Sequence, residues 1–100
     1  RPKAKDIVPA TDLFDPAHPL FDKTCVLTGE LLKLSDREAM QRIADCGGKN
    51  ADNVTKKTDL LIVGGGSPRE KKSGKVRKAE EYIEKGIPIQ IISEEEFLQM

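Results

Sequence analysis

A run of four consecutive apolar residues, Leu60-Leu61-Ile62-Val63, constrains the fold more than any other feature of this 100-residue chain. A strand with one face in water alternates apolar and polar residues, whereas a continuous apolar run is typical of a strand covered on both faces. Three glycines at positions 64–66 end the run. We therefore expect one small domain whose sheet has helices packed on both sides.

Three other segments are expected to form strands. Segment 24–28 is apolar and β-branched, ends at Gly29, and predicts a strand. A weak, polar strand is expected near residues 49–51. Segment 87–92 predicts the last strand, and Pro88 lies near its start, where a missing N–H donor is tolerated.

The first helix has clear signals at both ends. Ser35 and Glu38 have the spacing of a capping box, in which each side chain bonds the backbone at the other residue. Apolar residues follow at intervals of three and four, and Gly47-Gly48 ends the helix. We expect one of these two glycines to have a positive φ.

Two more helices are expected in the second half of the chain. One is capped by Ser73 and ends at Lys85-Gly86, and the other begins with a second capping box at 93–96. The apolar positions expected to anchor them are Val76, Ala79 and Ile83 in the former and Phe97 and Leu98 in the latter.

The resulting order is strand, helix, strand, strand, helix, strand, helix. This alternation predicts an α/β fold with a parallel sheet, right-handed crossovers and helices on both faces. Residues 1–20 hold four of the six prolines and show no helical or strand period, so we expect a linker or irregular arm there. The domain itself is predicted to span residues 21–100, with Phe14, Leu20 and Phe21 fixing the arm to it.

Composition excludes several classes of protein. Seventeen basic and seventeen acidic residues cancel, so the chain cannot hold nucleic acid by bulk charge, and any such contact must be local. No apolar run approaches the roughly 20 residues of a membrane span, and none resembles a signal peptide. Cys25, Cys46 and His18 do not form a metal-binding pattern. We expect a cytoplasmic monomer without metal, cofactor or membrane contact.

Catalysis is not expected of this chain. The acidic residues cluster at helix starts and exposed faces, where capping and solvation account for them. No nucleophile-elbow motif is present, and no catalytic triad can form around His18. A phosphate-loop motif would need Gly where Arg69 stands and Ser or Thr where Val76 stands, so nucleotide hydrolysis is excluded.

The start of the second helix, at residues 73–75, is the strongest candidate binding site. A helix N-terminus presents unpaired N–H groups and a partial positive charge, both of which favour a phosphate. A solvated charge run on a surface loop would also account for its basic neighbours. The one acidic residue in this stretch is Glu70. The basic neighbours are Arg69, Lys71, Lys72, Lys75, Arg77 and Lys78.

The predicted topology would add the end of the first strand to this site. Ligands of doubly wound sheets bind beyond the carboxyl ends of adjacent strands whose crossovers leave in opposite directions. If the first and third strands are those neighbours, Thr28-Gly29 and Ser73-Gly74-Lys75 meet at one anion-sized site. A hydroxyl, a backbone amide and an ammonium there suit a terminal phosphate.

The sequence also contains a specific set of family motifs. In chain order they are TCVLTG at 24–29, REA at 37–39, GGK at 47–49, VTKKTDLLIVG at 54–64, SGK at 73–75, KA at 78–79, Gly86 and ISEEEFL at 92–98. Over about residues 20–100 the chain resembles a BRCT domain. It is similar to the single phosphate-binding BRCT modules of NAD-dependent DNA ligases and of the clamp-loader large subunit. Segments 18–21 and 89–98 look closest to modules that follow bacterial proofreading-type exonuclease domains, which resemble the ε subunit of DNA polymerase III.

The resemblance implies a four-stranded parallel sheet of order 2-1-3-4 flanked by three helices. It also implies that Thr28 and Gly29 contact a phosphate at the end of the first strand, and that Lys75 contacts it from the second helix. Some DNA-binding members have an arginine just before the first helix, where this chain has Asp36, with the candidate Arg37 one position later. The tryptophan common in the last helix is Phe97 here.

Two functions remain open at this point. The leading one is a non-catalytic DNA-binding module that recognises a 5′-phosphorylated end or nick and localises a parent replication or repair enzyme, an exonuclease or a ligase. The alternative is a protein–protein or phosphopeptide interaction module. DNA contacts beyond one phosphate would need the basic segment 69–78, whereas a phosphoserine would need mainly Thr28, Gly29 and Lys75. With four aromatic residues in the chain, base stacking is not expected.

Overall fold

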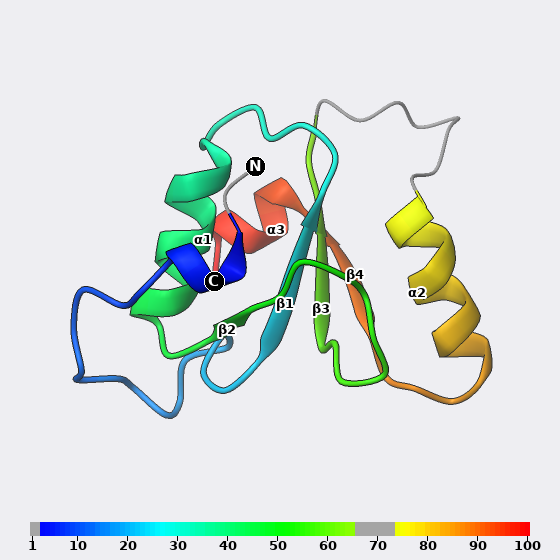
Figure 1. The fold of residues 1–100 in the computed structure, drawn as a ribbon, viewed down its shortest axis with the longest axis horizontal. Helices are drawn as coiled ribbons and strands as arrows, with labels where there is room; N and C mark the ends of the chain where they lie inside the picture. Colours follow the sequence, from blue (N-terminus) through cyan, green and yellow to red (C-terminus); the bar gives the residue numbers. More distant parts are fainter. Residues whose placement is uncertain (1–2, 66–73) are drawn as a thin grey trace.

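The sheet follows the predicted order. The computed structural model describes residues 3–65 and 74–100. Its four parallel strands lie in the order β2-β1-β3-β4 (Figure 1). The strands are β1 (Thr24–Thr28), β2 (Lys49–Asn50), β3 (Leu60–Val63) and β4 (Gln90–Ser93). The helices are η1 (Ala4–Asp6), α1 (Asp36–Asp45), α2 (Gly74–Glu84) and α3 (Glu94–Leu98).

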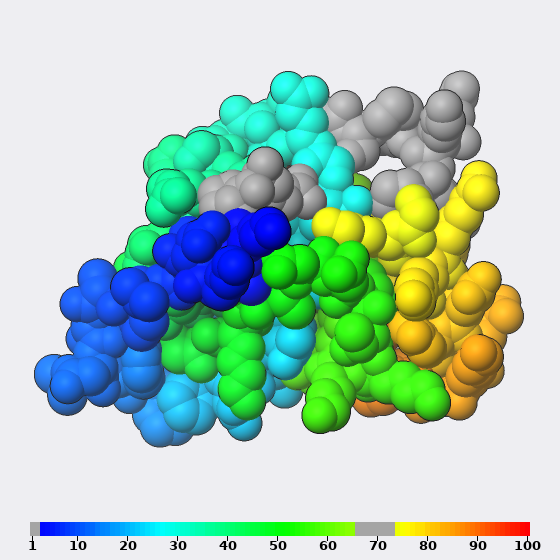
Figure 2. Space-filling view, in the orientation of Figure 1, coloured from blue at the N-terminus to red at the C-terminus, as the bar shows by residue number. Residues whose placement is uncertain are grey.

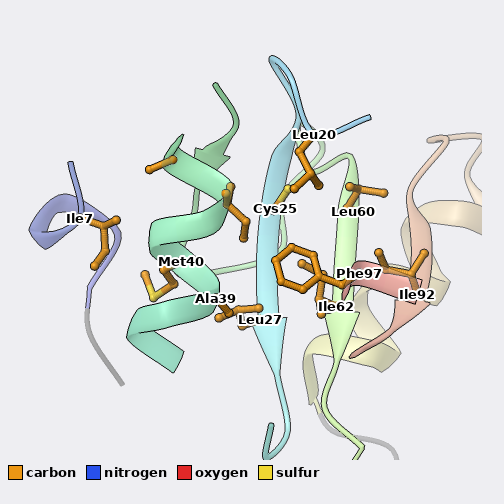
Figure 3. Close-up of a cluster of buried hydrophobic side chains, with 12 residues drawn as sticks. Ile7, Leu20, Cys25, Leu27, Ala39, Met40, Leu60, Ile62, Ile92 and Phe97 are labelled. Carbon is orange, nitrogen blue, oxygen red and sulfur yellow. The ribbon is translucent and has the colours of Figure 1, made fainter. Parts of the chain in front are cut away.

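The helices form two layers, with α1 and α3 on one face of the sheet and α2 on the other (Figure 1). Alternate residues of β3 point to opposite layers. Leu60 and Ile62 pack in the cluster that contains α1 and the Phe97 ring of α3 (Figure 3), whereas Leu61 packs with Ala79 of α2. The predicted burial of this strand on both faces is confirmed.

The predicted caps are present to different degrees. At the start of α1, the Ser35 hydroxyl accepts from the Glu38 N–H at 3.1 Å and the Glu38 carboxylate accepts from the Ser35 N–H at 3.2 Å, which completes the capping box. At α3, the Ser93 hydroxyl accepts from the Glu96 N–H at 3.2 Å. The Glu96 carboxylate lies 3.4 Å from that same hydroxyl, so the two side chains bond each other and the reciprocal backbone bond is replaced.

Two expectations about the second half of the chain need correction. Strand β4 begins at Gln90 rather than at residue 87, because the Ile87 N–H bonds the Tyr82 carbonyl and the Ile89 N–H bonds the Ile87 carbonyl. The expected apolar face of α2 also shifts, since Ile83 is 41% exposed and Tyr82 packs against the core instead.

The N-terminal arm packs along the α1 layer. Ile7 is buried beside α1 (Figure 3), and the Ala10 N–H donates to the Asp45 carboxylate at 2.7 Å. Leu20 is fully buried, and Phe21 lies against the end of α1 at Gly47. These contacts hold the arm along the domain. A domain boundary at residues 20–21 stays a prediction.

The burial of β3 makes a specific prediction about stability. Leu61→Ala should lower the free energy of unfolding by about 2–5 kcal/mol, because it opens a cavity at a fully buried position. Leu13 is 85% exposed, so Leu13→Ala should change stability by less than about 0.5 kcal/mol. Urea denaturation measures both variants, and equal losses would contradict the assignment of Leu61 to the core.

The end of α1 makes a second prediction about stability. Gly47 has φ +83°, as expected for one of the two glycines, and a Cβ there would lie 2.7 Å from Cδ2 of Phe21. Gly47→Ala should therefore cost about 1 kcal/mol or more in the free energy of unfolding.

Gly74 provides the matched control, since it opens α2 and a Cβ there meets nothing within 4 Å. Gly74→Ala should leave thermal stability unchanged or raise it, because alanine favours helix. The same drop in melting temperature for both variants would contradict this account of the helix end.

Candidate functional site

The carboxyl ends of β1 and β3 lie side by side at the topological switch point of the sheet. Thr28 pairs with Val63, and the Gly64 N–H donates to the Thr28 carbonyl at 2.9 Å. The chain leaves β1 through α1 toward β2 on one side and leaves β3 through α2 toward β4 on the other. The predicted adjacency of the first and third strands is therefore confirmed, and a crevice is expected there.

Lys75 connects α2 to this edge. It lies in the first turn of the helix, and its Nζ donates to the Leu27 carbonyl at 3.2 Å. The side chain is partly buried, so its ammonium lies over the end of β1 rather than extending into water. A positive charge is thereby held next to Thr28.

A cavity of about 490 Å³ joins these elements, and it is called the Thr28 cavity below. It brings together four of the predicted site residues, namely Thr28 from β1 and Gly74, Lys75 and Lys78 from α2. The predicted Gly29 follows Thr28 directly, with φ +77°. The Thr28 cavity is therefore lined by two lysines, a threonine and the beginning of a helix.

The other predicted residues do not line this cavity or lie outside the described residues. Arg37 is exposed in the first turn of α1, which packs on the face of the sheet opposite α2. Arg77 is exposed on α2 beside Lys78, but it is not part of the cavity wall. The remaining predicted residues, Arg69, Lys71, Lys72 and Ser73, lie outside the described residues.

Asn53 and Val54 also line the cavity, although neither was a predicted site residue; Val54 begins the family motif at 54–64, and Asn53 lies just before it. They belong to the loop between β2 and β3. Because all four strands are parallel, the loop that follows β2 begins at the same edge of the sheet as the end of β1. That topological argument could have identified the loop, but it could not have selected Asn53 within it.

Glu94 is a buried acid that organises the segments next to the site. It is only 3% exposed, so the expectation that capping and solvation account for the acids does not hold for Glu94. Its carboxylate accepts from the N–H groups of Leu32 at 2.9 Å, Lys33 at 2.7 Å and Gly65 at 3.2 Å. One side chain thus fixes both the loop after β1 and the turn after β3.

Backbone hydrogen bonds also set the charge of this group. Burial by itself raises the pKa of Glu94, but the N–H donors of Leu32, Lys33 and Gly65 outweigh it and hold the pKa below its ordinary value. The side chain is therefore a carboxylate near neutral pH. Gly64 adds a close backbone approach at the same place, since a Cβ there would collide with the Glu30 carbonyl.

Both cysteines of the described residues have raised pKa values. Burial, with a smaller effect from Asp59, raises the pKa of the Cys25 thiol to about 12, and partial burial raises the pKa of Cys46. Both thiols are therefore protonated near neutral pH. Within residues 3–65 and 74–100, no three His, Cys, Asp or Glu side chains lie close enough to hold a metal ion. None of the helices in those ranges has the length and apolarity to span a membrane.

Comparison with known proteins identifies the family. Residues 16–100 match the family model of the BRCA1 C Terminus (BRCT) domain. A DNA ligase of Syntrophotalea carbinolica is 39% identical over 82 residues, which are 82% of this chain and 11% of that protein. A DNA ligase of Brevibacillus brevis is 42% identical over 82 residues, again 11% of its length. A DNA ligase of Syntrophus aciditrophicus is 36% identical over 98 residues, 13% of its length. The chain spans only about a tenth of these relatives.

The bonds of Glu94 predict how stability depends on pH. Glu94→Gln should lower the free energy of unfolding at pH 7 by about 1.5–3 kcal/mol, because it removes charge-assisted bonds and turns an amide NH₂ toward backbone donors. The folded-state pKa is lowered, so the contribution is present near neutral pH and is lost as pH falls through that pKa.

The difference between wild type and Glu94→Gln should therefore shrink in acid, as measured by urea denaturation between pH 7 and pH 3. Glu95→Gln is the control, since Glu95 is exposed and makes only a 3.9 Å surface pair with Lys33. A stability difference that does not change with pH, or an equal loss in Glu95→Gln, would contradict the role of Glu94.

Proposed function

Because the chain belongs to the BRCT domain family, we propose that it is a non-catalytic module that binds a 5′-phosphorylated DNA end or nick. The observation that carries the proposal is the Thr28 cavity, where Thr28, Gly74 and Lys75 converge. Its sequence relatives are DNA ligases, which favours a role in replication or repair. In this role the module localises a parent enzyme on DNA. Its predicted similarity to exonuclease modules leaves an exonuclease as well as a ligase as that parent.

The cavity has the chemistry that a terminal phosphate requires. The first turn of α2 carries no acidic residue, and its backbone N–H groups contribute partial positive charge. Lys75 adds a charge-assisted donor and Thr28 a hydroxyl. A terminal phosphate carries more negative charge than an internal phosphodiester, so this concentration of donors favours a DNA end over the interior of a strand.

The described residues do not provide a way to read DNA sequence. Tyr82 packs in the cluster under α2 and Phe97 is fully buried between β3 and α1. No aromatic side chain lines the Thr28 cavity. Base stacking and base-edge recognition are therefore unsupported, and we expect binding that depends on the phosphate and not on the sequence.

Removal of the Lys75 ammonium tests this function. Lys75→Ala should weaken binding to a 5′-phosphorylated duplex roughly tenfold or more, since a charge-assisted bond contributes about 1.5–3 kcal/mol. Thr28→Val should cost less, because a neutral hydroxyl bond contributes about 1 kcal/mol. Lys85→Ala is the matched control, as Lys85 follows the opposite end of α2 and lies over the Tyr82 ring.

The measurement is a fluorescence titration at fixed salt with duplexes that differ only in the 5′-phosphate. Wild type and Lys85→Ala should prefer the phosphorylated end, and Lys75→Ala should lose the preference. Equal binding of both ends by wild type would refute the proposal. A phosphoserine peptide serves as a third probe, and binding of this peptide without binding of either duplex would establish the phosphopeptide alternative.

A further inference from the structure

A second cavity of about 410 Å³ lies next to the Thr28 cavity and includes the N-terminal arm in its wall. Buried residues of β1 and α1 form its inner wall, and Lys3, Asp52 and Asn53 stand at its exposed side. Asn53 and Lys75 line both cavities, so the two adjoin. Figure 2 shows the arm (blue), the β2–β3 loop (green) and the start of α2 (yellow) side by side on this face.

Specific contacts hold the arm in this position. The Ala4 N–H donates to the Asp52 carboxylate at 2.8 Å, which ties the residue after Lys3 to the β2–β3 loop. Further along, Ile7 is buried among core side chains and the Gln41 amide donates to the Val8 carbonyl at 2.7 Å. Lys3 is therefore fixed beside the cavity by its neighbours, although its own side chain is exposed.

The charges at this cavity favour an anion. Lys3 and Lys75 supply two positive charges against one negative charge in the wall, that of Asp52, whose carboxylate accepts the Ala4 N–H. Asn53 can add an amide donor. The wall contains no aromatic side chain on which a base could stack. This combination suits a backbone phosphate better than a nucleobase.

We propose that the second cavity binds a phosphodiester of the DNA strand whose 5′-phosphate occupies the Thr28 cavity, with Lys3 and Asn53 as contacts. This inference rests on the proposed function. When a DNA strand is bound by its terminal phosphate, its next phosphodiesters must lie against the neighbouring protein surface. The second cavity is that neighbouring surface, because Lys75 and Asn53 line both cavities. The arm thus belongs to the DNA interface, and the chain recognises the end together with the backbone that follows it.

The test compares Lys3→Gln with Lys5→Gln, two variants that lose the same charge from exposed positions of the same arm. Only Lys3 lines the cavity. With a fluorescent 5′-phosphorylated duplex, Lys3→Gln should weaken binding about threefold to tenfold and reduce the log–log salt slope by about 0.9, as for one lost phosphate contact. Lys5→Gln should stay close to wild type, and both variants should keep the wild-type melting temperature.

A chemical change in the DNA locates the contact. The first, second and third phosphodiesters of the phosphorylated strand are replaced, one at a time, by neutral methylphosphonates. At one of these positions, the replacement should weaken the binding of the duplex by wild type and by Lys5→Gln. It should have little further effect on binding by Lys3→Gln, because the lysine charge that contacts this phosphodiester is already absent from that variant.

The outcomes separate this inference from the proposed function. If wild type prefers the phosphorylated end and Lys75→Ala loses that preference, but Lys3→Gln binds like Lys5→Gln, only the second subsite is wrong. The subsite is also wrong if every methylphosphonate affects wild type and Lys3→Gln equally. If wild type does not distinguish phosphorylated from unphosphorylated ends, or binds a phosphoserine peptide alone, both the function and the subsite are refuted.

Discussion

The parallel pairing of β1 with β3 is the constraint on which the rest of the structure depends. Four successive residue pairs, from Cys25 with Leu60 to Thr28 with Val63, bring both strands to their carboxyl ends at the same level. The alternation of side chains along these strands then divides the core into an α1–α3 layer and an α2 layer. The crossovers leave in opposite directions, so β1 ends between the loop that follows β2 and the start of α2, and both cavities are lined by residues of these three segments.

Glu94 joins this edge of the sheet to the C-terminal helix. It follows β4 directly, yet its carboxylate bonds backbone groups in the loop after β1 and in the turn after β3. An unpaired buried carboxylate would be costly, so these segments are held together by a requirement to satisfy one charge. The geometry around Thr28 therefore depends on a residue that does not itself line either cavity.

Local signals predicted most of the fold, and non-local contacts account for what was missed. The bounds of β1, β3 and α1 follow from apolar runs and a capping box, which are properties of neighbouring residues. The burial of Glu94 depends on a bond to Leu32, 62 positions away, while its place at a helix start gave a sufficient local explanation. Asn53 likewise lies just outside the family motif at 54–64, so no local signal selected it. The convergence of Thr28 and Lys75 at one cavity was predictable, because topology and a family resemblance both indicated it.

A chain with no net charge can still bind an anion if its charges are arranged unevenly. The first turn of α2 has no acid, whereas α3 places three acids in its own first turn, on the opposite layer of the sheet. Two of those acids, Glu95 and Glu96, are exposed, and ion screening limits such surface charges to a range of about 8–10 Å, so they do little to cancel the lysines of the other layer. The third, Glu94, is buried and its carboxylate is bonded to backbone N–H groups. Long-range attraction to DNA is correspondingly small. Under the proposed function, affinity therefore comes from direct contacts at the cavities, and a terminal phosphate, with its additional charge, gains more from them than an internal phosphodiester does.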